Sequence, residues 1–180
     1  MDYNAITAWT GLVMALVAVC GLWIESKRHR FSMGVDLLLR LEDQFTAERM
    51  YANRRKAVLA FQANNYTDAV NEIDEIIDFF EGVGFMMSQG ALNKKMVWTF
   101  FSTYLFYFWH FAQEYVEQER KRDPTIWSEF IKLYRTLVKI ERKACRKCGM
   151  EFKLSEKDYQ QFLQEETRLR VPGALLNNRP

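Results

Sequence analysis

The sequence predicts an all-α protein in which one apolar helix near the N-terminus precedes a bundle of about five helices. Hydrophobic residues make up 49% of the 180 residues and aromatic residues 15%, which is enough for a packed core. The chain contains three prolines and eight glycines, so long helices are favoured over a turn-rich β fold. Its net charge of +2 is too balanced to indicate a protein that binds duplex nucleic acid.

A charge-free apolar segment extends from Tyr3 to Ile24 near the N-terminus. Within it, the stretch from Ile6 to Ile24 has a mean hydropathy of roughly 2.0, a value typical of membrane-spanning helices. A helix from about Ala5 to Ile24 is long enough to cross the hydrocarbon layer of a bilayer. Trp9 and Trp23 near its two ends suit the interfacial layers. The segment is therefore predicted to be a transmembrane anchor.

The charges beside this segment predict its orientation. Asp2 is the only charged residue before it, and the cluster Lys27-Arg28-His29-Arg30 follows it. Because basic residues flank spans on the cytoplasmic side, the N-terminus is expected outside and the rest in the cytoplasm. The start of the chain has no basic residue, which disfavours a signal peptide, and the bulky Val19 before Cys20 disfavours a lipoprotein. Residues 1–30 are interpreted as anchor and juxtamembrane segment.

Residues 31–172 are predicted to form one cytoplasmic α-helical domain, and residues 173–180 a frayed tail. Apolar residues recur at helical spacing in its first helix: Leu37, Leu38, Leu41 and Phe45. Thr67 is expected to cap a second helix. The apolar stripe of that helix contains Ile73, Ile76, Ile77 and Phe80.

Three acidic residues share another face of the second helix: Asp74, Asp78 and Glu81. Such a row can bind a cation or a basic partner. A solvated helix face explains the same pattern, and it is the preferred interpretation here.

The segment from Met96 to Gln113 carries no charge, so a second membrane span is an alternative. Its mean hydropathy is only roughly 0.7, and crossing would place the cluster Arg120-Lys121-Arg122 outside. One seam contains Trp98, Phe101, Leu105, Phe108, Ala112 and Tyr115; a second contains Phe100, Tyr104, Tyr107 and Phe111. A helix that is apolar on two sides is expected at the centre of a bundle, packed against Phe80 and Phe130.

Two further helix starts are expected. Asp123-Pro124 combines an acidic cap with proline at the first helical position. Ser155 and Asp158 resemble a capping box for a last helix, which Val171-Pro172-Gly173 is expected to end.

The order of these features resembles a known family. The apolar N-terminal helix, the basic step and the leucine-rich helix are followed by Ile76-Ile77-Asp78-Phe79-Phe80-Glu81, Trp98 with Trp109, Arg120 or Arg122, and Trp127 with Phe130 and Leu133. This pattern resembles an uncharacterised prokaryotic domain-of-unknown-function family of short membrane-anchored helical proteins, over roughly Leu37 to Leu137. The resemblance supports the architecture and implies no catalytic residue.

The sharpest local motif is Cys145-Arg146-Lys147-Cys148-Gly149. Two thiols at this spacing, followed by glycine, form half of a structural zinc site, so a second subunit would have to supply the other pair. The neighbouring Lys and Arg residues are expected to lower the thiol pKa values and favour redox chemistry. A pair of reduced cysteines at a helix end is the preferred interpretation, so no metal ligand is assigned.

Other candidate groups are weaker. His110 and Glu114 lie one helical turn apart, but the further carboxylates of a di-iron site are missing, and a hydrogen-bonded core or interfacial histidine is preferred. The clusters Arg54-Arg55-Lys56 and Arg120-Lys121-Arg122 are interpreted either as solvated helix ends or as contacts to anionic headgroups. No phosphate loop, nucleophile elbow or zinc-protease motif is present in the sequence.

These patterns lead to one functional hypothesis with two alternatives. The preferred one is a single-pass, non-enzymatic interaction or scaffold protein that partners the lipid bilayer and either a second copy or another membrane protein. Gly11, Ala15 and Ala18 offer a helix-pairing face. The alternatives are a metal-dependent or redox sensor that uses Cys145 and Cys148, and a two-span subunit of a membrane complex. No nucleic acid, cofactor or small-molecule substrate is assigned.

Overall fold

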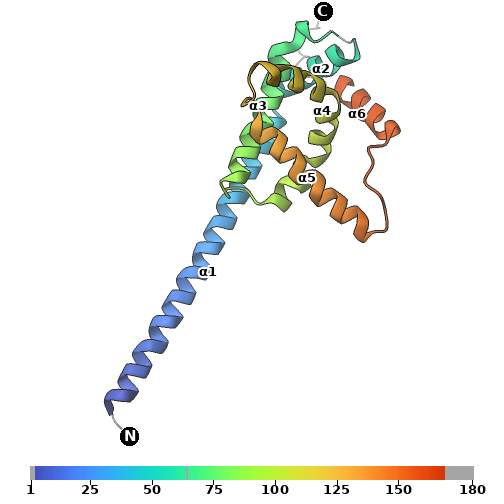
Figure 1. Cartoon of the computed structure of the whole chain (residues 1–180). Helices are drawn as coiled ribbons and strands as arrows, with labels where there is room; N and C mark the ends of the chain where they lie inside the picture. The colour runs from blue at the N-terminus through green and yellow to red at the C-terminus, as the bar shows by residue number, and fades with distance from the viewer. Residues whose placement is uncertain (1–2, 64, 169–180) are drawn as a thin grey trace, which may run out of the picture.

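The computed structural model describes residues 3–63 and 65–168, and side chains at residue 14 and from residue 16 onward. Within these ranges every regular element is helical, which confirms the all-α prediction (Figure 1). The elements are α1 (Tyr3–Phe45), α2 (Glu48–Gln62), the short 3-10 helix η1 (Thr67–Ala69), α3 (Val70–Ser88), α4 (Lys94–Arg122), α5 (Ser128–Lys147) and α6 (Glu156–Arg168).

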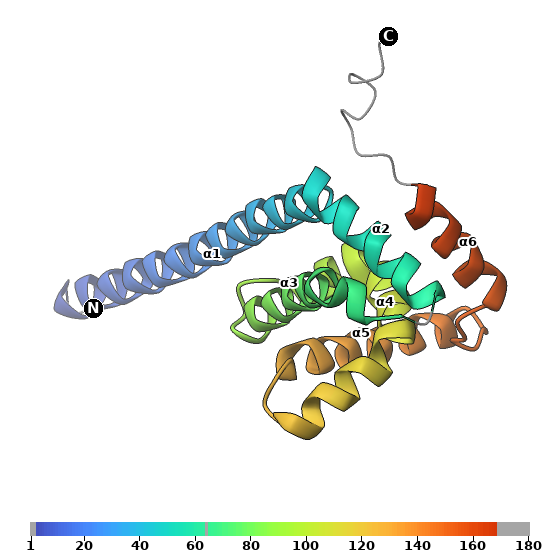
Figure 2. The same cartoon turned by 90° about the horizontal axis from the view of Figure 1, so that it is seen from above.

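Helix α1 is one unbroken helix of 43 residues, about 64 Å long. The expected boundary at residue 30 therefore lies inside a helix. Figures 1 and 2 show its N-terminal half projecting away from the other helices. Only its C-terminal part packs on the bundle, through Leu38, Leu41 and Phe45.

In the part of the chain that the structure describes, no helix combines the length and the apolar character needed to cross a bilayer. Half of the predicted anchor falls on residues 5–13 and 15, whose side chains lie outside that description. Its described remainder, residues 14 and 16–24, is too short to span the hydrocarbon layer. The structure therefore does not support the span, and the transmembrane anchor stays a prediction from the sequence.

Helix α4 is the central element, as the buried interpretation of Met96 to Gln113 predicts. Phe101, Leu105 and Phe108 are at most 2% exposed. The ring of Phe80 lies 6.5 Å from that of Phe101 and 6.4 Å from that of Phe108. The ring of Trp109, also in α4, lies 5.4 Å from that of Phe130 in α5. The expected packing of α4 against α3 and α5 is confirmed.

The second seam of α4 is covered less completely than expected. Tyr104 and Tyr107 are half-buried, and their rings lie 6.2 Å and 4.7 Å from Phe162 in α6. Phe100 remains 38% exposed. Helix α6 thus closes the bundle on the face that α3 and α5 leave open.

Two expected helix starts differ in the structure. Thr67 begins η1, and its hydroxyl donates to the side chain of Asn65 (2.6 Å) instead of capping a helix. Asp123 accepts from the backbone N–H of Thr125 (2.9 Å), so it closes a turn before α5 begins at Ser128. The expected end of the last helix at Val171-Pro172-Gly173 and the tail 173–180 lie outside the described residues.

Helices α3 and α5 approach each other closely at Gly84. A Cβ atom at this position would lie 2.6 Å from the carbonyl oxygen of Glu129, which is backbone and cannot move aside. A Cβ atom at Gly82, two residues earlier, would meet nothing within 4 Å. The close approach therefore requires glycine at one of these positions and not at the other.

Phe108→Ala is expected to lower the free energy of unfolding by about 3–5 kcal/mol, because it leaves a cavity in the ring cluster of the core. Urea unfolding of the full chain in mild detergent, followed by circular dichroism, measures the loss. Phe100→Ala, at the exposed end of the same helix, is the control and is expected to change stability by less than about 1 kcal/mol. Equal effects of the two changes would contradict the central position of α4.

Gly84→Ala is expected to cost about 1–3 kcal/mol, because α3 and α5 must move apart. Gly82→Ala is expected to stabilise the protein by about 0.5–1 kcal/mol, since it replaces an uncrowded helical glycine. The same unfolding measurement gives both values. A stabilising Gly84→Ala would show that the two helices are not held at this distance.

Candidate functional site

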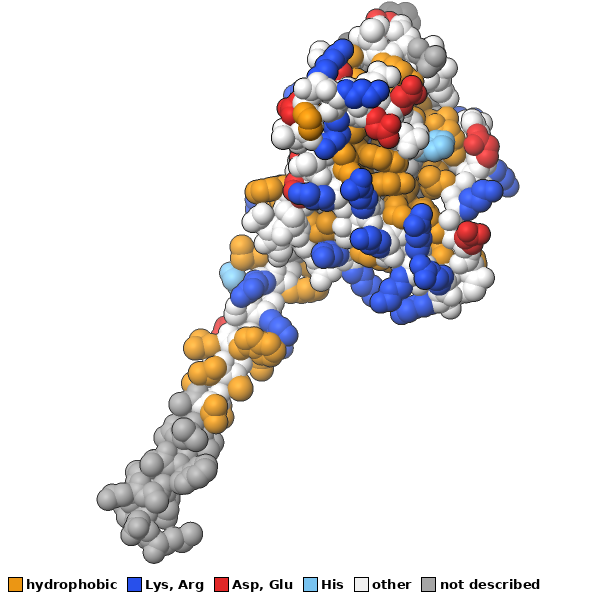
Figure 3. Space-filling model, viewed as in Figure 1, with side chains coloured by type: hydrophobic (Ala, Val, Ile, Leu, Met, Phe, Trp, Pro, Cys, Tyr) orange, Lys and Arg blue, Asp and Glu red, His pale blue; other side chains and the backbone are white. Residues whose placement is uncertain are grey.

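The N-terminal half of α1 presents a large apolar surface to its surroundings. Its exposed side chains, each more than half accessible, are Met14, Leu16, Val17, Val19, Leu22, Trp23 and Ile24. They point in all directions around the axis, because neighbouring residues of a helix are about 100° apart. Figure 3 shows this apolar stretch with Lys and Arg side chains directly beyond it. The Nζ atom of Lys27 lies 3.9 Å from the ring centre of Trp23.

The acidic row on α3 joins helices instead of facing solvent alone. The hydroxyl of Tyr115 donates to Asp74 (2.8 Å), and the indole N–H of Trp127 donates to Asp78 (2.8 Å). The backbone N–H of Phe130 donates to Glu81. The interpretation of these acids as a solvated face is wrong for Asp74 and Glu81, which are half-buried and accept hydrogen bonds from α4 and α5, whereas Asp78 is exposed.

Glu81 completes the N-terminus of α5. The residue at the N-cap position, Trp127, has a left-handed backbone (φ 52°, ψ 36°) and contributes no side-chain cap. The side-chain oxygen that caps a helix normally belongs to the N-cap residue itself. Here Glu81 of α3 supplies it, and this carboxylate accepts from the third backbone N–H of α5. Burial raises the pKa of nearby Asp74, and the hydrogen bond from Tyr115 lowers it in part.

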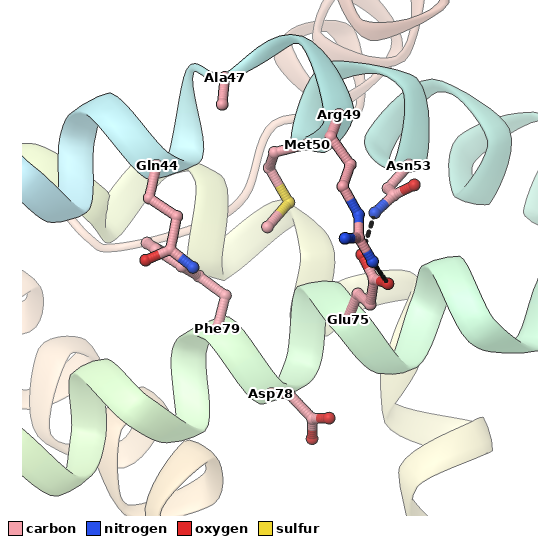
Figure 4. Close-up of a pocket in the computed structure, with 8 residues that line it drawn as sticks. All are labelled: Gln44, Ala47, Arg49, Met50, Asn53, Glu75, Asp78 and Phe79. Atoms are coloured by element: carbon pink, nitrogen blue, oxygen red, sulfur yellow. Dashed lines mark hydrogen bonds and ion pairs between the residues drawn. The ribbon is translucent and has the colours of Figure 1, made fainter.

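An open groove of about 420 Å³ lies where α1 meets α2 above α3 (Figure 4). Met50 and Phe79 form its apolar wall. Arg49 and Asn53 both donate to the carboxylate of Glu75, across the groove from α2 to α3. These contacts occupy the carboxylate, so the groove is a helix junction rather than a set of groups arranged around a reacting atom.

A fully buried ion pair joins α2 to α6. The guanidinium of Arg54 donates through Nε to Glu166 (2.9 Å), and its Nη2 contacts the other carboxylate oxygen. Its Nη1 donates to the carbonyl oxygen of Phe45 (3.3 Å). The side chains of the pair are 2% and 4% exposed. The interpretation of Arg54 as part of a solvated cluster is wrong for this residue.

Aromatic rings surround this guanidinium. Its Cζ atom lies 4.3 Å from the ring centre of Phe45 and 4.8 Å from that of Tyr104. Burial raises the pKa of Glu166, and the hydrogen bonds and charge of Arg54 lower it in part. The sequence contains a signal for this site, because Met50, Arg54 and Ala57 follow the spacing of one helix face.

The other predicted clusters are also partly engaged. Arg120 donates to the carbonyl oxygen of Ile126, and Arg122 pairs with Glu119 (2.9 Å). Lys121 is exposed at the same helix end. Arg120 thus bonds to the turn after α4, whereas Arg122 pairs within α4 itself.

Cys145 and Cys148 lie at the C-terminal end of α5, where the chain turns at Gly149 (φ 70°). The thiol of Cys145 donates to Glu141 (3.6 Å), whereas Cys148 is exposed. Burial raises the pKa of the Cys145 thiol, and Glu141 raises it further. This is opposite to the lowering expected from the neighbouring Lys and Arg residues, because the thiol faces the carboxylate. The zinc site between two subunits stays an untested alternative to a pair of reduced cysteines.

His110 and Glu114 line an open cavity of about 480 Å³ between α2, α4 and α6. His110 is exposed, and its ring lies 4.7 Å from that of Tyr159 at an angle of 76°. Within residues 3–63 and 65–168, no group of three or more His, Cys, Asp or Glu side chains is arranged to hold a metal ion.

Comparison with known proteins identifies a match to one protein family. A family model described as Domain of unknown function (DUF4760) matches residues 5–137. The match includes the apolar half of α1, the acidic row and Arg54, and it ends within α5, before the cysteine pair and Glu166. No curated protein and no solved structure matches the chain.

Arg54→Met is expected to lower the free energy of unfolding by about 3–5 kcal/mol at neutral pH, because it leaves Glu166 buried without its partner. Replacing both residues, as Arg54→Met with Glu166→Leu, is expected to restore most of this loss. Urea titration of the full chain measures each variant. Arg55→Met, one residue away on the exposed face, is the control and should change stability by about 0.5 kcal/mol or less.

The loss in Arg54→Met is also expected to depend on pH. Without Arg54 the folded-state pKa of Glu166 rises further above its unfolded value, so stability falls as pH rises through that window. The variant should thus approach the stability of the unchanged protein below about pH 4, where the carboxyl is protonated in both states. A loss that is independent of pH would contradict the buried pair.

Proposed function

The chain belongs to the DUF4760 family of domains of unknown function, and we propose that it acts as a membrane-anchored helical adaptor. In this proposal the N-terminal half of α1 crosses the cell membrane once, with the N-terminus outside. The domain from residue 31 onward lies in the cytoplasm and holds a partner protein, or a second copy of the chain, at the membrane. No chemical reaction is assigned to it.

The exposed apolar half of α1 is the observation that carries this proposal. Each large apolar side chain left in water forgoes about 1.5–3 kcal/mol of burial free energy. Because these side chains point in all directions, one flat protein surface cannot cover them, whereas lipid surrounds a helix completely. The charge-free sequence from Tyr3 to Ile24 extends the same surface toward the N-terminus.

The residues at the end of this surface support the orientation. Trp23 and Lys27 stack on one another, and Arg28 and Arg30 are exposed beside them. An aromatic ring followed by cations is the usual composition of the cytoplasmic interface of a span.

The unbroken helix supports the adaptor part of the proposal. Because α1 continues from the apolar surface into the bundle, an anchored chain holds its bundle at a fixed distance from the bilayer. Gly11, Ala15 and Ala18 give the anchor a face of small residues on which a second helix can pack.

The full chain is expected to stay in the membrane pellet after alkaline carbonate extraction. Val17→Arg with Val19→Arg should release it, because each arginine costs about 2.5–3.5 kcal/mol near the centre of a span. Leu39→Arg, at an exposed apolar position of the same helix beyond the basic cluster, is the matched control and should remain in the pellet.

Release of the unchanged chain by carbonate would overturn the anchor. The orientation is tested in cells that express the chain with a C-terminal reporter that is active only outside the cytoplasm. This reporter should remain silent.

A further inference from the structure

We propose that the exposed face of α5 is a second membrane contact, which docks the bundle onto anionic lipid headgroups. This inference rests on the proposed anchoring of α1. It concerns a different part of the chain, the helix α5.

Helix α5 has a strongly one-sided charge distribution. It contains seven Lys and Arg residues and two glutamates. All seven cations are exposed, and in the described part of the chain only Lys132 has an ion pair among them, with Glu129 (2.6 Å). The six others are Arg135, Lys139, Arg142, Lys143, Arg146 and Lys147.

The glutamates of α5 do not neutralise this face. Glu129 is half-buried and bound to Lys132. Glu141 is also half-buried, where it accepts from the indole N–H of Trp98 (2.6 Å) and from the thiol of Cys145. Both carboxylates therefore point into contacts within the protein, and the outer surface of α5 is cationic. Figure 3 shows Lys and Arg side chains gathered over this helix and its C-terminal end.

The position of this face selects lipid as its partner. Figure 1 shows that the C-terminal end of α5 and the start of α4 lie on the side of the bundle from which α1 projects. The loop before α4 lies directly against α1, because a Cβ atom at Gly34 would lie 3.2 Å from the carbonyl oxygen of Ala91. The exposed Lys94 and Lys95 follow directly.

The distance from the bilayer permits the contact. Gly34 follows Ile24 by ten positions, which is about 15 Å along α1. The headgroup layer is about 5–8 Å thick, and its negative potential extends about a further 8 Å at physiological salt. Lys94 and Lys95 therefore reach this field with α1 upright. A typical helix tilt of about 20° toward α5 brings its C-terminal end closer to the bilayer.

The test uses the full chain reconstituted into vesicles of phosphatidylcholine, with or without phosphatidylserine. Replacing Cys20 and Cys145 by serine leaves the exposed Cys148 as the labelling site at the end of α5. A nitroxide on this thiol reports its proximity to nickel-chelating headgroups. We expect close contact in the vesicles that contain phosphatidylserine, and its loss in neutral vesicles and at high salt.

Two matched variants localise the effect. Arg142→Gln, Lys143→Gln, Arg146→Gln and Lys147→Gln together should reduce the proximity to the value in neutral vesicles. Arg55→Gln, Lys121→Gln, Lys157→Gln and Arg168→Gln together remove the same charge elsewhere and should leave it unchanged. Equal loss in both variants would overturn the docking face, as would equal proximity in both kinds of vesicle. Circular dichroism confirms that each variant is folded.

The outcome separates the two proposals. If the chain floats with neutral vesicles but the proximity of the label does not depend on phosphatidylserine, the anchor is supported and the docking face is contradicted. If the chain binds only the anionic vesicles and salt releases it, the anchor is contradicted and the docking face is supported. Displacement of the label from anionic vesicles by polyuridylate would assign the face to nucleic acid and overturn the lipid contact.

Discussion

The buried guanidinium of Arg54 is the constraint on which the arrangement of four helices depends. A cation this deep in a protein must have its donors satisfied, because an unpaired buried charge costs several kcal/mol. Its partners come from three other elements: the end of α1 through Phe45, α4 through the ring of Tyr104, and α6 through Glu166. Helix α6 is therefore required as a cover for a charge that belongs to α2.

Helix α3 organises the opposite side of the core by a similar means. Its apolar stripe packs on α4, and its acidic row accepts hydrogen bonds from Tyr115, Trp127 and Phe130. The left-handed backbone at Trp127 and the missing Cβ at Gly84 belong to this same contact. Packing, capping and close approach thus fix α5 on α3 at one position.

The sequence predicts the parts of this fold that depend on local periodicity. The stripe around Phe80 and the seam of Phe101 and Phe108 both follow helical spacing, and both lie in the core. Hydrogen-bond partners that are far apart in the chain leave no such pattern. Asp78 meets the indole N–H of Trp127 across 49 positions, and Arg54 meets Glu166 across 112. Charged residues without a visible partner are thus interpreted as solvated, which is wrong for the buried Arg54, whereas Asp78 is exposed and still accepts the indole hydrogen bond.

The continuity of α1 has a mechanical consequence. An α-helix without a break resists bending and twisting. The apolar half of α1 and the bundle are therefore expected to move together as one rigid body. Rotation of the outer half about its own axis would turn the groove beside Met50 and the cationic side of α5 by the same angle. If α1 is anchored as proposed, its motion inside the bilayer would be converted directly into reorientation of these surfaces.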